Sequence, residues 1–371
     1  MNKFKFLTII LCCVLLFCTK QTKVFFINRS ILKNSSKNVF DLKSYNNTIT
    51  KEYITNSFLK ENNIEKGFKF TEIIEYGDNY KFGVSTKRSN LRFLPIDSPI
   101  YKNNDTDFDY LQNSEIKFNE PLLILFEYNG WYFVQTYNAI GWVKSADIAI
   151  FKTKKSFINY ITNRKFLIVT NKNINVDNIY ADMGVKINYT KKYKEFFVIT
   201  IPERNKNGYV NFKNKIISKD GLNVGYLVYN RKNVIKQAYK YLGIGYGWGG
   251  SNNSVDCSGF ISNVYSSFGI KLPRDSINQQ KSTGNYIDIS PNKTRGERLD
   301  ILKKKAKIGS LLYFKGHIML YLGFLNDKPY IIHSVALFNN EKVMSIITSD
   351  LDIRRNNGTT FIDSLSSITN L

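Results

Sequence analysis

A chain of 371 residues is longer than one hydrophobic core usually organises, so we expect several domains. Hydrophobic residues make up 43% of it and aromatic residues 15%, which argues against extensive disorder. The formal net charge of +23 comes from Lys and Arg residues that are spread along the chain, beside abundant Asn, Ile, Tyr and Phe. This pattern is typical of an AT-rich genome. Because no nucleic-acid recognition motif accompanies the charge, we expect no nucleic-acid partner.

The N-terminus has the features of an export signal, over residues 1–20. Lys3 and Lys5 precede an apolar run that is too short for an ordinary membrane-spanning helix. Cys18 follows this run and resembles a lipoprotein cleavage position only loosely, because Phe17 stands where a small residue is usual. A lipoprotein, an uncleaved membrane anchor and an atypically cleaved signal all stay open. We expect an exported protein of the cell envelope, periplasmic or extracellular.

Cysteine usage singles out one residue of the folded body. Cys12, Cys13 and Cys18 all lie in the N-terminal segment, so Cys257 has no second body cysteine with which to form a disulfide. It is therefore either a buried inert thiol or a reactive one. The chain has only two histidines, and no Cys or His pair has close ligand spacing. We expect no metal site and no cofactor.

The next part of the chain predicts a linking region and a first small barrel. Residues 21–79 are polar with scattered apolar positions, and we interpret them as a stabilising or linking region with short helices such as 56–63. Between 80 and 150 the residue pattern predicts strands on both sides of the hairpin turn Asn129-Gly130. These strands are expected over 122–126, 131–135 and 141–143. Trp131 and Trp142 are expected in the barrel core.

Two further domains follow in the predicted order. Residues 151–222 contain short strands that predict a second small barrel, expected over 166–170, 196–201 and 209–212. Residues 223–371 predict helices first and an antiparallel sheet afterwards, which is an α+β domain. Its helices are expected over 234–242 and from Cys257 to Phe268, and its strands over 308–314, 317–324 and 330–335.

Cys257 and the two histidines form a candidate catalytic set. Cys257 lies in the first turn of a predicted helix, where unpaired N–H groups and the helix dipole favour a thiolate. His317 begins a predicted strand and His333 lies in the next, so a hairpin brings them together. His317 is then placed to take the thiol proton, and His333 to hold the His317 ring in the right tautomer. Spacing alone also fits a buried cysteine and two ordinary histidines.

Local sequence around these residues resembles the NlpC family of papain-like cysteine peptidases. The matching segments, in the family's order and spacing, are Tyr246-Gly-Trp-Gly-Gly250, Asp256-Cys-Ser-Gly-Phe260, Leu272-Pro-Arg-Asp-Ser-Ile-Asn-Gln279 and Gly316-His-Ile-Met-Leu-Tyr-Leu-Gly323. The resemblance covers about residues 230–340. Ser310 departs from it, because an Asp often stands at that position. That Asp is not a triad member, so we expect activity to be kept.

The resemblance extends upstream of the peptidase. The segments Asn90-Leu-Arg-Phe-Leu-Pro95, Asp109-Tyr-Leu-Gln-Asn113, Gly130-Trp-Tyr-Phe-Val-Gln135 and Gly141-Trp-Val143 look like the first bacterial SH3-type domain of one branch of this family. In that branch two such domains precede the peptidase, and the preceding domain closes one end of the cleft. The resemblance thus implies an α+β papain-like peptidase domain preceded by two small all-β SH3-like barrels.

The same branch implies roles for further residues. Its enzymes cut between γ-D-glutamate and the diamino acid of peptidoglycan stem peptides, often of stems with a free N-terminal L-alanine. Tyr246 matches a tyrosine beside the nucleophile that orients substrate or contributes to the oxyanion site. Asp256 and Ser258 match positions that bind the substrate α-amine, although Asp256 also fits a helix N-cap. Arg274 is expected to have a structural role in its loop.

We therefore expect a cell-wall cysteine endopeptidase that acts on stem peptides. Two alternatives stay open: an acyltransferase or amidase of the same fold on another acyl substrate, and a wall-binding protein without catalysis. The second is disfavoured because Cys257, His317 and His333 are all present. The diamino acid and the oligomeric state are not determined by the sequence.

Overall fold

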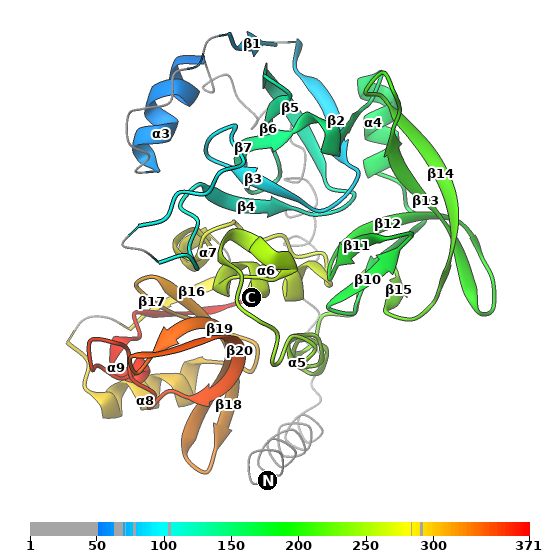
Figure 1. Cartoon of the computed structure of the whole chain (residues 1–371). Coiled ribbons are helices and arrows are strands. Elements are labelled where there is room, and N and C mark those ends of the chain that lie inside the picture. The colour runs from blue at the N-terminus through cyan, green and yellow to red at the C-terminus, as the bar shows by residue number, and fades with distance from the viewer. Residues whose placement is uncertain are drawn as a thin grey trace. The chain divides into compact units, whose positions relative to one another are not determined.

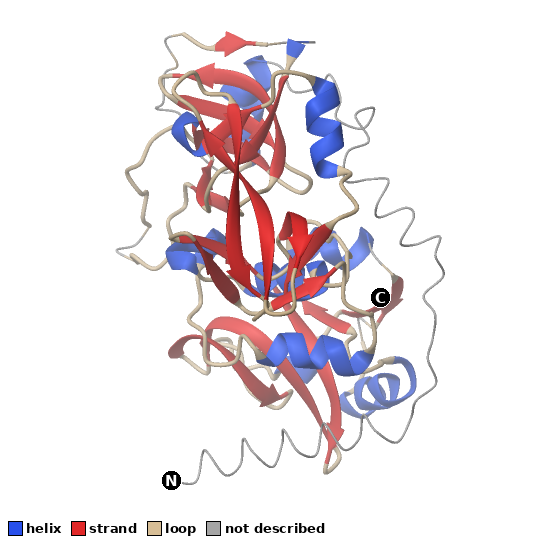
Figure 2. Ribbon diagram, turned by 90° about the vertical axis from the view of Figure 1, so that its right-hand side faces the viewer, coloured by secondary structure: helices blue, strands red, loops and turns tan. Residues whose placement is uncertain are grey.

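A computed structural model describes residues 51–62, 70, 72–76, 79–102, 105–282, 284–289 and 292–371. The expected export signal, with Cys18, lies outside these residues. The described chain forms two compact units, here called the N-terminal unit, up to Leu227 with Trp248–Asn252, and the C-terminal unit, Val228–Gly247 with Asn253–Leu371. Strands dominate both units and the helices are short (Figure 2). No helix among the described residues is long and apolar enough to cross a membrane.

The first part of the N-terminal unit is an eight-stranded antiparallel sheet (Figure 1). Its hydrogen-bonded order is β4-β3-β7-β6-β5-β2-β8, with β1 paired to β5. The turn Asn129-Gly130 joins β5 and β6 with positive φ at both residues, as the predicted two-residue hairpin requires. The strands are β1 (Ile74–Glu75), β2 (Lys81–Ser85), β3 (Ser89–Arg92), β4 (Gln112–Ile116), β5 (Pro121–Tyr128), β6 (Trp131–Gln135), β7 (Ile140–Lys144) and β8 (Ile148–Ile150), and a 3-10 turn (Ser145–Asp147) precedes β8.

The N-terminal helical segment belongs to the core of this sheet. The π-helical turn η1 (Tyr53–Ser57) and α3 (Phe58–Glu61) bury Ile54, Phe58 and Leu59 in one cluster with Trp131 and Trp142. Both tryptophans are therefore core residues, as expected. The segment contributes apolar side chains to the fold, which agrees with a stabilising role for this part of the linking region.

The second part of the N-terminal unit is a five-stranded antiparallel sheet in the order β14-β13-β12-β9-β15, with a separate β10-β11 ribbon. Its elements are α4 (Lys154–Ile161), β9 (Phe166–Val169), β10 (Asn173–Val176), β11 (Ile179–Asp182), β12 (Lys186–Lys192), β13 (Phe196–Arg204), β14 (Val210–Ser218) and β15 (Leu222–Val224). The helix α4 was not expected from sequence. Its single fully buried apolar side chain, Phe157, is too weak a periodic signal to reveal a helix.

One sequence expectation for this unit needs correction, and one proposed domain boundary differs slightly from the compact unit. Both sheets are open paths of hydrogen-bonded strands, because the end strands of each pair with only one neighbour in the described chain, so closed barrels are not observed. The expected boundary between 222 and 223 cuts through β15, which pairs with β9. The compact unit instead continues to Leu227.

The C-terminal unit is an α+β fold with one six-stranded sheet in the order β16-β21-β17-β18-β19-β20. Its elements are α5 (Arg231–Tyr239), α6 (Cys257–Ser266), α7 (Ser276–Ser282), β16 (Asn285–Asp288), α8 (Arg295–Lys305), β17 (Leu311–Phe314), β18 (His317–Leu325), β19 (Lys328–Phe338), β20 (Glu341–Asp350), α9 (Phe361–Ser364) and β21 (Ser367–Asn370). The expected helices and the three central strands are present with shifted ends. The helix α8 has a polar sequence, and a capping box between Thr294 and Glu297 begins it.

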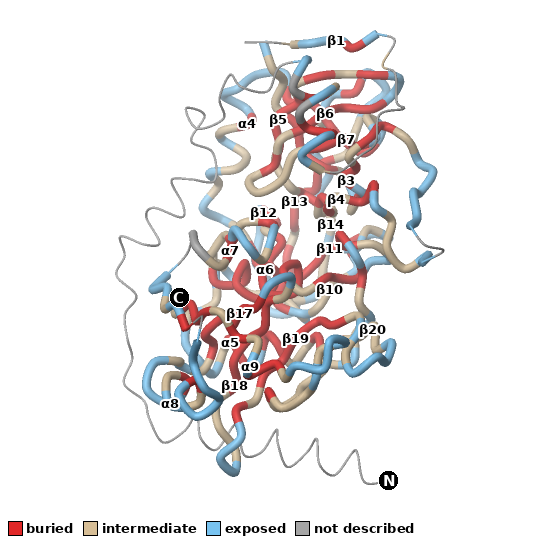
Figure 3. Tube along the Cα trace, turned by 90° about the vertical axis from the view of Figure 1, so that its left-hand side faces the viewer, coloured by how far each residue is buried: buried red, intermediate tan, exposed pale blue. Residues whose placement is uncertain are grey.

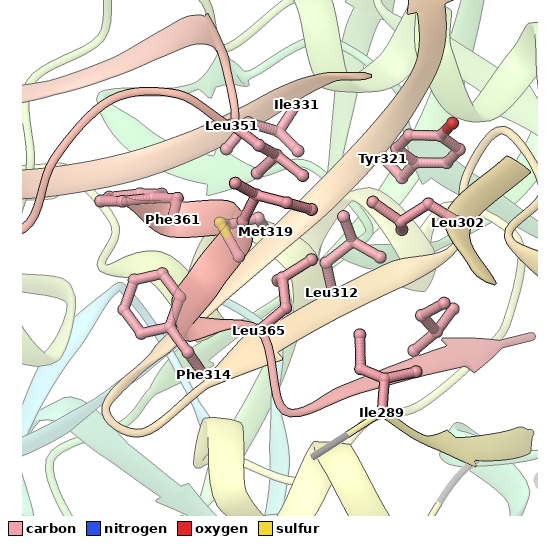
Figure 4. Close-up of a cluster of buried hydrophobic side chains, with 12 residues drawn as sticks. Ile289, Leu302, Leu312, Phe314, Met319, Tyr321, Ile331, Leu351, Phe361 and Leu365 are labelled. Carbon is pink, nitrogen blue, oxygen red and sulfur yellow. The ribbon is translucent and has the colours of Figure 1, made fainter. Parts of the chain in front are cut away.

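The core of the C-terminal unit lies against this sheet. Phe314 of β17 and Phe361 of α9 make an edge-to-face pair with ring centroids 4.8 Å apart, and both belong to the apolar cluster drawn in Figure 4. Residues of β17, β18 and β19 are largely buried (Figure 3). The strand β18 begins at His317, so this rigid sheet carries the first candidate catalytic histidine.

We predict that Phe58→Ala destabilises the N-terminal unit by about 3–5 kcal/mol, because Phe58 is buried and its ring lies 5.3 Å from that of Phe133. Tryptophan fluorescence in a denaturant titration measures this, since Trp131, Trp142 and Trp248 all lie in that unit. The control Lys60→Ala changes an exposed residue of the same helix and should shift stability by less than about 0.5 kcal/mol. Equal midpoints for the two variants would show that the segment is not part of the cooperative fold.

Candidate active site

Cys257 is the first residue of helix α6, as the sequence predicts. Asp256 caps this helix, and its Oδ1 accepts a hydrogen bond from the Gly259 N–H at 2.8 Å. The helix ends at Ser266, and Gly269 follows with a φ of 77°. Every helix residue after Cys257 is buried, so the helix is held firmly and the half-buried Cys257 lies at its open end.

The two histidines lie on neighbouring strands. Phe314 pairs with His317 across the two-residue turn Lys315-Gly316, where Gly316 has a φ of 88° that favours glycine. His317 begins β18 and His333 lies on β19. Nε2 of His317 is 2.8 Å from Nδ1 of His333, so the hairpin brings the rings together as expected.

The hydrogen bonds around the histidines favour one arrangement of protons. Nε2 of His333 lies 3.4 Å from Oγ of Ser349 on β20. If this Nε2 donates to Ser349, then Nδ1 of His333 accepts from Nε2 of His317. Nδ1 of His317 is then an unprotonated nitrogen. It is the ring nitrogen that remains to accept the proton of a thiol.

Cys257 and His317 line the same pocket, which has a volume of about 420 Å³. Two hydrogen bonds to the carbonyl of Val255 connect neighbouring elements to the segment before Cys257: one from Oγ of Ser334 at 3.0 Å and one from the N–H of Gly247 at 3.1 Å. Ser334 follows His333 directly, so β19 and the start of α6 are joined at the site. The thiol also lies near the backbone N–H of Ile318, which lowers its pKa.

Burial dominates the protonation of the site. It raises the pKa of Cys257 to about 12, and the nearby Asp256 carboxylate adds to this rise. Burial lowers the pKa of His317 to about 3, with a further decrease from Arg355. Burial and His317 hold the pKa of His333 well below its ordinary value. The resting site therefore contains a neutral thiol and neutral imidazoles, although the helix position alone favours a thiolate.

Asp256 and Ser258 belong to a buried network centred on Arg274. Arg274 Nη2 donates to Asp256 Oδ2 at 2.6 Å, and Arg274 Nη1 donates to Ser258 Oγ at 2.9 Å. The Ser258 hydroxyl donates to Asp256 Oδ1 at 3.1 Å. The positive charge and hydrogen bonds of Arg274 outweigh burial and lower the pKa of Asp256, so the carboxylate is ionised. Arg274 has the structural role expected for it.

The segment after Arg274 is fastened to the same helix. Gln279 Nε2 donates to the carbonyl of Ser258 at 3.2 Å, to Oγ of Ser262 at 3.0 Å and to the carbonyl of Pro273 at 2.8 Å. The Gln279 amide thus satisfies carbonyl groups of the helix and of the loop that need a hydrogen-bond donor when they are buried. The motif from Leu272 to Gln279 therefore anchors the loop to α6.

Two further sequence features of the motif region have structural explanations. Tyr246 is half-buried, lines the pocket with Cys257, and has a pKa raised by burial, so its hydroxyl keeps its proton. Ser310 is buried, accepts a hydrogen bond from the Lys307 N–H at 2.8 Å and donates to Asn370. The serine hydroxyl therefore accepts the hydrogen bond from the Lys307 N–H just before β17, so no aspartate is needed there.

The chain leaves the C-terminal unit between Gly247 and Asn253, and Trp248–Asn252 belong to the N-terminal unit. Gly249 and Gly250 have φ angles of 57° and 80°. A Cβ on Gly249 would lie 2.9 Å from the backbone oxygen of Gln112, and one on Gly250 would clash with Glu115. The two glycines of the motif therefore permit a close approach to β4 that no residue with a side chain allows.

The pocket contains residues that the sequence reasoning did not identify. Lys315, Phe314, Arg355 and Phe361 line it with Cys257 and His317. Lys315 was detectable as part of the turn before His317. Arg355 comes from the turn after β20, and no local pattern connects it with the motifs. No group of three or more His, Cys, Asp or Glu residues that suits a metal ion occurs in the described chain.

Comparisons with known proteins agree with this geometry. Residues 243–361 match the NlpC/P60 family and residues 97–144 match an SH3 domain of the SH3b1 type. A probable endopeptidase p60 of Listeria welshimeri is 35% identical over 96 residues, which cover 24% of this chain and 16% of that protein. Dipeptidyl-peptidase 6 of Lysinibacillus sphaericus is 28% identical over 139 residues, 37% of this chain and 44% of that one. The matches thus span less than half the length of these relatives.

A solved structure resembles almost the whole chain. An NlpC/P60 endopeptidase from Photobacterium damselae subsp. piscicida superposes with a TM-score of 0.73 at 17% identity, covering 93% of each chain. At this identity the likeness establishes the fold and no finer property. The fold is therefore the NlpC/P60 papain-like fold accompanied by an SH3-type domain.

We predict that Cys257 carries no thiolate at pH 9 in the folded protein, because burial raises its pKa from 9.0 to about 12. In the unfolded chain most of the same thiol is ionised at that pH, since the ordinary cysteine pKa is about 8.5. The measurement is the ultraviolet thiolate absorbance of the wild type minus that of Cys257→Ala, with and without denaturant. The folded state retains a proton that the unfolded state loses between these pKa values, so stability falls as pH rises through this window. A thiolate signal from the folded protein at pH 7 would contradict the neutral resting pair.

Proposed function

We propose, from the NlpC/P60 family domain that this chain carries over 243–361 with an SH3 domain over 97–144, that it is a cell-wall cysteine endopeptidase. The observation that carries the proposal is the shared pocket of Cys257 and His317, with Nε2 of His317 2.8 Å from Nδ1 of His333. We assign cleavage of the bond between γ-D-glutamate and the diamino acid of peptidoglycan stem peptides. The SH3-type domain, and a second one over the five-stranded sheet, fit an enzyme that works on the wall.

The mechanism follows from the proton arrangement at the site. Cys257 attacks the γ-carbonyl carbon while Nδ1 of His317 takes the thiol proton, because neither group is charged at rest. We assign stabilisation of the oxyanion to the Tyr246 hydroxyl and to N–H groups at the start of α6. His317 then protonates the leaving amine, and water releases the acyl group from Cys257. His333 and Ser349 hold the His317 ring in the required tautomer.

The Cys257→Ala variant should abolish cleavage and leave the circular dichroism spectrum unchanged, since one sulfur at a helix start contributes little packing. His317→Ala should be nearly as severe. His333→Ala should be milder, because orienting a base is worth less than being the base. The assay is mass spectrometry of synthetic stem tripeptides and intact muropeptides. Near-normal turnover by Cys257→Ala would exclude the thiol mechanism, and equal activity of the two histidine variants would undo the assignment of their roles.

Recognition of a free N-terminal L-alanine is the finer part of the proposal. Asp256 and Ser258 flank Cys257. The lowered pKa of Asp256 keeps its carboxylate ionised, and we assign to this carboxylate the pairing with the ammonium of the substrate. The same carboxylate already pairs with Arg274 and caps α6. When the substrate lacks a free amine, the charge of Asp256 is still partly neutralised by Arg274. The free-energy cost of binding a blocked substrate is therefore smaller than that of leaving a buried carboxylate unpaired.

Stems with a free amine should be cut about tenfold faster than the same stems acylated at that amine, equivalent to roughly 1.4 kcal/mol in the transition state. Asp256→Asn should erode this ratio mainly by slowing the free-amine substrate. Because Asn also weakens the pair with Arg274, thermal unfolding of the variant is measured beside the kinetics. Equal rates for free and acylated stems, with a loss of stability in Asp256→Asn, would restrict Asp256 to helix capping.

The final element of the proposal is export to the cell envelope, based on residues 1–20, with Cys18 as a site of lipid attachment. The protein should fractionate with the envelope, and Cys18→Ser should release it or stall its processing. Immunoblotting of fractions measures both effects, with Cys13→Ser as the matched control. Wild-type protein found only in the cytoplasm would overturn the export assignment.

A further inference from the structure

One face of the five-stranded sheet in the N-terminal unit carries an apolar row that points away from the core. Residues directly opposite each other on antiparallel strands lie on the same face of a sheet. Val198 of β13 is opposite both Lys191 of β12 and Ile216 of β14, so the three side chains share one face. The next residue on β13, Ile199, is buried in the core on the other face. Ile216 therefore lies on the solvent side, where it is 73% exposed.

Helix α4 covers only the far part of this face. Tyr160 of α4 stacks on Phe212 of β14 with ring centroids 4.8 Å apart. The Tyr160 carbonyl also accepts a hydrogen bond from the side-chain amide of Asn188 of β12 at 3.0 Å, and Asn188 is buried. The part of the face nearer the turn between β12 and β13 lies beyond these contacts, and Val198 there is only half-buried.

The turn between β12 and β13 extends the apolar row with two aromatic rings. The N–H of Tyr193 donates to the carbonyl of Phe196 at 2.9 Å, which closes the turn. The two rings are stacked with centroids 4.5 Å apart, yet Tyr193 remains 44% exposed. Phe196 and Val198 alternate along β13 and so lie on the same face. Tyr193, Phe196, Val198 and Ile216 are here called the apolar strip.

Lysines surround the apolar strip at the turn. Lys191, Lys192 and Lys194 are all exposed, and Glu195 is the only acidic residue among residues 191–196. Within the described part of the chain these three ammonium groups have no carboxylate partner. The lysines in the middle of β14 do have one, in the pairs Lys213 with Glu203 and Lys215 with Asp177. The end of the sheet that carries the apolar strip is therefore cationic.

Exposed apolar side chains and unpaired lysines together select one kind of partner. A soluble polyanion would bind the lysines and leave Ile216 in contact with water. An anionic bilayer offers phosphates at its surface and an apolar layer directly below, so it satisfies both groups. Lysine side chains can lie along the apolar layer and extend their ammonium groups to the phosphates, and tyrosine is favoured at the level of the headgroups.

We propose that the turn between β12 and β13 binds the surface of an anionic phospholipid bilayer. Tyr193 and Ile216 enter the headgroup layer, and Lys191, Lys192 and Lys194 bind the lipid phosphates. Attachment of a protein to a membrane is firm only when two weak signals act together, and this turn supplies one that is separate from residues 1–20. The inference concerns where the protein is held and is independent of the proposed cleavage chemistry.

The test places a fluorescent probe in the turn itself. Tyr193→Trp adds a tryptophan whose emission is quenched by brominated acyl chains only if the turn reaches the bilayer. Vesicles of phosphatidylglycerol mixed with phosphatidylcholine should quench it, and vesicles of phosphatidylcholine alone should not. Subtracting the signal of the wild type removes the contribution of Trp131, Trp142 and Trp248. Because the probe reports on the turn, membrane binding by residues 1–20 does not imitate the result.

Further substitutions in the Tyr193→Trp background separate the two contributions. Replacing Lys191, Lys192 and Lys194 together by Gln should raise the lipid concentration for half-maximal quenching by about tenfold or more. Ile216→Ser should raise it by roughly fivefold, because an apolar side chain no longer leaves water.

Two matched controls use exposed residues elsewhere. Replacing Lys303, Lys304 and Lys305 of α8 by Gln removes the same charge, and Tyr180→Ser removes an exposed ring from β11. Both controls should stay within about twofold of the Tyr193→Trp protein. Since every changed side chain is exposed, the circular dichroism spectra should all coincide.

Three results would overturn the inference. The first is an added tryptophan that is not quenched, or is quenched equally by neutral and anionic vesicles. The second is an α8 control that weakens quenching as much as the lysine changes in the turn, since binding would then follow net charge alone. The third is an Ile216→Ser variant that behaves like the Tyr193→Trp protein while the lysine changes abolish quenching, which would identify a site for a soluble polyanion instead of a bilayer.

Discussion

The buried ion pair between Asp256 and Arg274 organises the start of α6, the helix that begins with Cys257. Asp256 is 7% exposed and Arg274 is 8% exposed, so both charges have lost most of their hydration. Such a pair is retained only when further hydrogen bonds satisfy the remaining groups, here Gly259 N–H and the Ser258 hydroxyl. The pair therefore connects the loop that carries Arg274 to the first turn of α6, and the position of the Cys257 sulfur depends on it.

The same burial determines the electrostatics of the chemistry. A helix N-terminus favours a thiolate by roughly 0.3–2 kcal/mol when it acts alone. The surrounding apolar groups and the Asp256 carboxylate act in the opposite direction and prevail, because they raise the pKa of Cys257 to about 12. Charge separation is then confined to the reaction itself. In the proposed mechanism His317 takes the thiol proton during the attack on the substrate.

The two ends of the site differ in charge for structural reasons. At α6 the only acidic group is neutralised by Arg274, whereas the turn after β20 presents Arg355 without a carboxylate partner in the described residues. The first arginine is part of a buried ion pair, and the second packs on the ring of Phe314 in the pocket lining.

Much of the site was predictable from local sequence. Cys257 at a helix start, His317 at the start of a strand and His333 on the next strand all follow from short-range patterns, because helix caps and the periodicity of apolar residues are local properties. The apolar sequences of β17 and β18 likewise predict buried strands. Ends of elements shifted by a few residues, as in α5, because helix termini depend on caps such as Asn230.

Other features were decided only in three dimensions. The sequence indicates a glycine-rich loop at 247–250, but only the close approach of Gly249 and Gly250 to β4 explains why glycine is needed. The neutral thiol arises from desolvation by residues distant in sequence, which no local pattern reports. Arg355 enters the pocket because β20 pairs with β19 and the chain then turns back towards Phe314. Local interactions thus determined the elements and the position of Cys257 at a helix start, whereas long-range packing determined the protonation of the site and brought Arg355 into the pocket.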